Sequence, residues 1–139
     1  MREYLTQDVE QTIRTLIVKV PNFPIPRCTF TDITPILERD PIAFQALIHQ
    51  MCAPHRLHPP EVILCIESCG YLFGAPMAYA LGSRIVLARQ AGKLPRPTLH
   101  QAYAMGYDRH RHMEIHIGAI APASRVLIVD DVLAMGAPR

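Results

Sequence analysis

Two hydrophobic patterns follow one another along this chain of 139 residues, a helical one first and a strand-like one later. Apolar residues recur at helical spacing from Val9 to Val20, and Thr6 in front of them suits the capping position of a helix. The prolines of "PNFPIPR" then end this helix, and "CTFTDITP" reads as an extended loop or a short strand. A second helix is predicted to begin at Pro41 with Asp40 as its cap. Its apolar stripe consists of Phe44, Leu47, Ile48 and Met51.

Three later segments are apolar without alternation, which is expected of strands buried on both faces of a parallel sheet. They are "EVILCIES" at 61–68, "RIVLAR" at 84–89 and "RVLIVDD" at 125–131. "YLFGAPMAYAL" predicts a helix between the first two strands, although it contains Pro76. This order of strand, helix and strand predicts an α/β fold with an open, mainly parallel sheet and flanking helices.

The stretch between the second and third of these strands is more polar. "QAGKLPRPTLHQ" at 90–101 has the glycine and prolines of a loop, and the charged run "YDRHRH" at 107–112 predicts a solvated turn. "MEIHIGAI" at 113–120 alternates between polar and apolar residues, so it predicts a half-exposed strand.

The composition is that of an ordinary globular protein, since half of the residues are apolar and 19% are charged. A formal net charge of +2 gives no reason to expect nucleic acid or an anionic membrane as a partner. No apolar run approaches the roughly 20 residues of a membrane span, and the N-terminus has no signal-like apolar core. A cytoplasmic protein is therefore expected, with its four scattered cysteines as reduced thiols.

Polar and small residues follow each predicted parallel strand, in "ESCG", "RQAGKLP" and "DDVLAMGA". Ligands of open α/β sheets gather at these carboxyl ends. Asp130 and Asp131 could accept hydrogen bonds from the vicinal hydroxyls of a ribose, and the small-residue turn after them could present backbone N–H groups to a phosphate. The alternative is that the two acids only cap a turn.

The combination of motifs resembles a known family. "IVDDVLAMGA" is similar to the phosphoribosyl-pyrophosphate (PRPP) motif of type I phosphoribosyltransferases, in which Asp-Asp precedes Ala-Thr-Gly-Gly-Thr. "VPNFPIPRCTFTDITPIL", "IESCGYLFGAP", "LARQAGKLPRPT" and "AYAMGY" resemble, in the same order, motifs of the adenine phosphoribosyltransferase family. The resemblance covers essentially the whole chain.

The resemblance implies a purine salvage enzyme, a glycosyltransferase that converts adenine and PRPP to AMP and pyrophosphate, with Mg²⁺ bound through PRPP. It implies a type I phosphoribosyltransferase fold in a single domain over 1–139, with a base-binding hood in about 1–36 and a core in 37–139. This fold would be truncated at its C-terminus, since the family's phosphate loop continues into a helix and a further strand. A homodimer is also implied.

The resemblance assigns each matching position a role in binding substrate. Asp130 and Asp131 would hold the ribose hydroxyls, and the turn of Ala134, Met135, Gly136 and Ala137 would hold the 5′-phosphate. Glu67, Ser68, Cys69 and Gly70 would form the pyrophosphate loop, with positive charge from Arg89 and Lys93. The hood around Phe30 and Thr31 would cover the purine, and Tyr107 would close the site.

Several of these positions depart from the family's motifs. Cys69 and Thr31 stand where the motifs have arginine, and a thiol has no fixed charge for a leaving pyrophosphate. Gly106 replaces a glutamate proposed to handle the proton of the purine, so no catalytic residue is assigned. Met135, Ala137 and Pro138 replace residues of the phosphate loop. The alternative hypothesis is therefore a catalytically impaired relative or fragment with a nucleotide-binding, regulatory or subunit-interaction role.

A structural zinc site is a further, weaker alternative. Its candidate ligands are His110, His112 and His116, or Cys52, His55 and His58 with Cys65 and Cys69. None of these sets has the paired spacing typical of zinc ligands, so hydrogen-bonded or solvated histidines are favoured.

Overall fold

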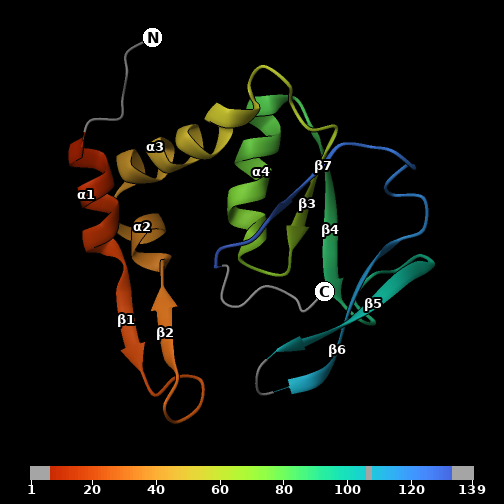
Figure 1. The fold of residues 1–139 in the computed structure, drawn as a ribbon, viewed down its shortest axis with the longest axis horizontal. Coiled ribbons are helices and arrows are strands. Elements are labelled where there is room, and N and C mark those ends of the chain that lie inside the picture. Colours follow the sequence, from red (N-terminus) through yellow and green to blue (C-terminus); the bar gives the residue numbers. More distant parts are fainter. Residues whose placement is uncertain (1–6, 106–107, 133–139) are drawn as a thin grey trace. The chain divides into compact units, whose positions relative to one another are not determined.

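In its described residues, the first part of the chain forms three α-helices and a two-stranded hairpin (Figure 1). In this computed structural model, which describes residues 7–105 and 108–132, α1 (Gln7–Leu16) is followed by the antiparallel strands β1 (Val18–Pro21) and β2 (Thr29–Asp32). Helices α2 (Thr34–Arg39) and α3 (Pro41–Cys52) and the 3₁₀ turn η1 (Ala53–His55) come next. The chain divides into two compact units, Met1–Pro54 and His55–Arg139.

The predicted start of the second helix is confirmed. The Asp40 carboxylate accepts hydrogen bonds from the backbone N–H groups of Ile42, at 3.0 Å, and Ala43, at 2.9 Å. Pro41 occupies the first turn, where no partner for an N–H is needed. The local chemistry of the cap therefore fixes where α3 begins.

Other predictions for this unit were wrong in detail. The first helix ends at Leu16, and Val20 lies in β1, where it pairs with Phe30 of β2. Cross-strand pairing with a distant segment decides this, and helical spacing within the segment cannot reveal it. Helix α2 was not predicted. The buried residues of α3 are Ala43, Ala46, Ile48 and Cys52, so only Ile48 of the predicted stripe is fully buried.

The described residues of the second unit form a five-stranded mixed sheet with helix α4 (Gly70–Leu81) on one face. Its strand order is β5-β6-β4-β3-β7, from β3 (Val62–Ile66), β4 (Arg84–Gln90), β5 (Thr98–Met105), β6 (Asp108–His116) and β7 (Val126–Val129). Strands β4, β3 and β7 are parallel, while β6 runs antiparallel to both β4 and β5. The predicted α/β fold with a parallel central sheet is confirmed, and the antiparallel hairpin is an addition to it.

That hairpin corrects two predictions. Residues 98–101 were expected in a loop, and 108–112 in a solvated turn, yet they lie in β5 and β6. The half-exposed strand expected at 113–120 ends at His116. The backbone hydrogen bonds between β5 and β6 do not depend on apolar side chains. The charged sequence of β6 therefore did not indicate a strand.

The sequence predicted that β3, β4 and β7 are buried on both faces, and of these three strands β3 is the most buried. Gly74 of α4 packs so closely that a Cβ atom there would lie 2.2 Å from the Cys65 sulfur. Apolar side chains of the neighbouring strands are exposed: Ile85, Leu87, Val126 and Ile128. In the described part of this unit α4 is the only α-helix, and it covers mainly β3. Within the described residues, none of the helices has the length and apolar character needed to cross a bilayer.

Candidate functional site

The loop after β3 and the end of β7 meet at the carboxyl edge of the parallel strands. A Cβ atom on Gly70 would lie 2.5 Å from the Val129 carbonyl oxygen and 3.2 Å from the Asp130 Cα. Only glycine permits this approach, because neither backbone can move away cheaply. The predicted pyrophosphate loop is therefore in contact with the predicted ribose-binding acids, although the two motifs are about 60 residues apart in the sequence.

The carboxylates of Asp130 and Asp131 and the thiol of Cys69 influence one another's protonation at this edge. Partial burial, followed by the neighbouring Asp131 carboxylate, raises the pKa of Asp130 to about 6. The Asp130 carboxylate also accepts the backbone N–H of Asp131 at 3.0 Å. Burial and the charge of Asp131 raise the pKa of the Cys69 thiol, so this thiol is neutral at pH 7. A reactive thiolate at Cys69 is therefore disfavoured.

Glu67 organises the cationic side of this edge. Its carboxylate accepts the backbone N–H of Gln90 at 2.8 Å and forms ion pairs with the Lys93 ammonium and, at 3.5 Å, the Arg89 guanidinium. The side chain is only 9% exposed. Burial alone would raise the pKa of Glu67, but the hydrogen bonds and charges of these partners outweigh it and lower the pKa. Glu67 thus faces its own cations rather than lying free for a ligand.

One buried acid in this region was missed by the sequence analysis. Glu114 of β6 is 7% exposed, and its carboxylate accepts hydrogen bonds from the turn that carries Lys93. Burial alone would raise the pKa of Glu114, yet the backbone and hydroxyl donors around it lower the pKa. The signal in the sequence was an acid among apolar residues in "MEIHI", which the alternating pattern placed on the polar side of a strand.

The predicted base-binding residues lie in the first unit, on the β1–β2 hairpin. Phe30 and Phe23 contact each other edge to face with ring centroids 5.4 Å apart, and both side chains remain exposed. The hydroxyl of Thr31 accepts a hydrogen bond from the Lys19 ammonium at 2.6 Å. The hairpin therefore carries an exposed aromatic pair, which is suited to stacking on a planar base.

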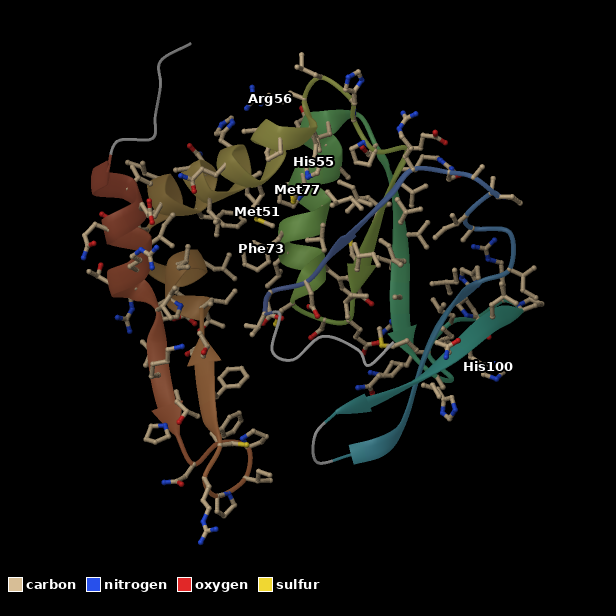
Figure 2. All side chains as sticks on the ribbon, viewed as in Figure 1. Met51, His55, Arg56, Phe73, Met77 and His100 are labelled. Atoms are coloured by element: carbon tan, nitrogen blue, oxygen red, sulfur yellow. The ribbon has the colours of Figure 1, made fainter. Side chains whose placement is uncertain are left out.

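Other predicted residues lie outside the described residues. These are Gly106, Tyr107, Ala134, Met135, Gly136, Ala137 and Pro138. Of the histidines considered for zinc, His112 of β6 contacts His100 of β5, with ring centroids 5.9 Å apart. Figure 2 labels His100 on the β5–β6 hairpin. Among the side chains that the structure describes, which do not include that of His110, no three from His, Cys, Asp or Glu lie close enough to hold a metal ion. The four cysteines are free thiols.

Known proteins are similar to this chain in sequence and in fold, although no protein-family model matches the chain. The adenine phosphoribosyltransferase of Anaeromyxobacter sp. (strain Fw109-5) is 42% identical over 126 residues, which are 91% of this chain and 70% of that protein. The crystal structure of adenine phosphoribosyltransferase from Thermoanaerobacter pseudethanolicus has a TM-score of 0.84 at 40% identity, covering 93% of this chain and 73% of that one. The Saccharomyces cerevisiae enzyme, complexed with an imino-altritol bisphosphate and adenine, has a TM-score of 0.83 at 34% identity, covering 93% and 74%.

Proposed function

Because this chain belongs to the adenine phosphoribosyltransferase family, we propose that it transfers the phosphoribosyl group of PRPP to adenine, giving AMP and pyrophosphate. The family resemblance found in the sequence is confirmed by relatives about 40% identical over most of the chain. The impaired-relative hypothesis is not favoured by these relatives. We also propose, from the family resemblance, that the chain acts as a homodimer in the cytoplasm.

One observation carries the assignment of the site. The pyrophosphate loop touches the strand end that carries the two acids, through the contact of Gly70 with the Val129 carbonyl. A ribose between these segments would have carboxylates on one side and the cations held by Glu67 on the other. This is the distribution of charge that a phosphosugar with a polyanionic leaving group needs.

The acids supply binding and orientation. We propose that Asp130 and Asp131 accept hydrogen bonds from the two ribose hydroxyls, which places C1′ at the carboxyl edge of the sheet. Holding the sugar and the base in one geometry lowers the entropic part of the barrier. The exposed pair of Phe23 and Phe30 supports the proposal that the hairpin stacks on adenine. Adenine is a ligand in the crystal structure of the Saccharomyces cerevisiae relative, which supports adenine as the base.

The cations act on the leaving group. Arg89 and Lys93 share one carboxylate, so one positive charge remains to attract the pyrophosphate. Mg²⁺ bound through PRPP would neutralise part of the pyrophosphate charge. The metal would take its oxygen ligands from PRPP and water, while Asp130 and Asp131 hold the ribose hydroxyls.

The test is a turnover assay with adenine and magnesium PRPP, following AMP by chromatography, with guanine and hypoxanthine as competing bases. We expect AMP to form and the other bases to be poor substrates. Asp131→Ala should raise KM for PRPP by about ten- to a hundredfold, since a hydrogen bond to a charged group contributes about 1.5–3 kcal/mol. Glu61→Gln is the matched control, because Glu61 precedes β3 at the opposite edge and pairs with Arg125. Saturable AMP binding without any turnover would contradict the proposal.

A further inference from the structure

The turn between β4 and β5 is fastened by a side chain from a third strand. One carboxylate oxygen of Glu114 accepts the backbone N–H groups of Gly92, at 3.0 Å, and of Lys93 and Leu94, both at 3.2 Å. Its other oxygen accepts the hydroxyl of Thr98 at 3.0 Å. Glu114 lies on β6 opposite Arg89 of β4 and His100 of β5, so it reaches the turn from between the two strands that the turn connects.

Three successive N–H groups converging on one oxygen form an anion-binding nest, and here a side chain fills it. Gly92 has φ of +83°, a left-handed conformation that gives the turn its shape. Without the carboxylate, these donors would lose their shared acceptor in a half-buried environment. The shape of the turn therefore depends on Glu114 and not only on its own sequence.

This turn carries one of the two cations of the site. The Lys93 ammonium pairs with Glu67, while the Lys93 carbonyl oxygen accepts a hydrogen bond from the Arg89 guanidinium at 3.1 Å. Lysine has a long flexible side chain, so the position of its charge depends on where its backbone is held. The backbone N–H of Lys93 is one of the three donors bound by Glu114.

We propose that Glu114 is a positioning residue for pyrophosphate: it fixes the turn that presents Lys93 to the leaving group of PRPP. The inference rests on the proposed function. Glu114 itself is buried behind the turn and donates nothing to a substrate. Its effect on PRPP is transmitted through the turn, and mainly through the ammonium of Lys93 that the turn carries.

The experiment is a double-mutant cycle on magnesium pyrophosphate affinity, measured by calorimetry at pH 7 on the full chain. Glu114→Gln keeps the size of the side chain and removes its charge. We expect it to weaken pyrophosphate binding by about tenfold, since small misplacements of a binding group have effects of this order or larger. In a Lys93→Ala background, the same change should weaken binding less than about twofold. In turnover, KM for PRPP should rise while KM for adenine stays unchanged.

Equal losses in both backgrounds, or unchanged affinity in Glu114→Gln, would overturn the proposal, because a merely structural role does not depend on Lys93. If Glu114→Gln fails to fold, Thr98→Val removes one of the four donors and leaves the carboxylate. We then expect Thr98→Val to weaken pyrophosphate binding when Lys93 is present and to leave it unchanged in the Lys93→Ala background. Equal losses of affinity in the two backgrounds would overturn the proposal. A wild-type chain that binds pyrophosphate but turns over no adenine would refute the proposed reaction and leave this cycle interpretable.

Discussion

Replacing Asp130 with asparagine should stabilise the protein at neutral pH and have no such effect in acid. The pKa of Asp130 is raised from 3.8 to about 6, so the folded state prefers the protonated acid. Stability is therefore greatest below pH 3.8 with respect to this group, and it is lost as pH rises towards 6. Above pH 6 the charged carboxylate imposes its full cost, which Asp130→Asn removes while keeping an oxygen for the Asp131 N–H.

The size of the effect follows from the shift. A difference of about two pKa units corresponds to roughly 3 kcal/mol without screening by solvent. The Asp130 carboxyl is partly desolvated, but the residue as a whole is exposed, so water and salt reduce this, and we expect a gain of about 1 kcal/mol at pH 7. Urea unfolding at pH 7 and at pH 4 measures the free energies, with Glu61→Gln as a carboxylate control from an exposed ion pair. A gain of equal size at both pH values, or a loss at pH 7, would refute the reasoning.

Three further changes test separate parts of the structure. Cys69→Arg restores a fixed charge beside Asp131 and should lower KM for PRPP by about tenfold in the turnover assay, whereas Cys69→Ser should not. Gly74→Ala should destabilise the chain by about 1–3 kcal/mol in urea unfolding, because its Cβ would overlap the Cys65 sulfur; adding Cys65→Ala should recover much of this loss. Asp40→Ala removes the α3 cap and should cost about 1 kcal/mol in the same assay, with Asp40→Asn as a nearly neutral control.

The sequence predicted the features that depend on neighbours along the chain. Asp40 and Pro41 fixed the start of α3, and the apolar run at Val62–Ile66 was recognised as a strand of a parallel sheet. The motifs at Glu67 and Asp130 indicated the family because their order and residue types are local properties. Each of these signals lies within a few residues of the feature that it specifies.

Features that depend on distant partners were not visible in this way. The polar run that forms β6 is a strand because β5 pairs with it, and Val20 is in a strand because Phe30 lies opposite. Glu67 was predicted to contact substrate, but only the folded chain shows it paired with Arg89 and Lys93.

The sequence by itself therefore determined which residue types are available at the carboxyl edge of this sheet, and in which family they occur. The tertiary structure decided which of them face one another. Gly70 meets the end of β7, and Glu114 reaches the turn of Lys93, across sequence separations of about 60 and 20 residues. Close contacts and hydrogen bonds act over a few ångströms, so such pairings depend on strand order and register, which no local pattern encodes.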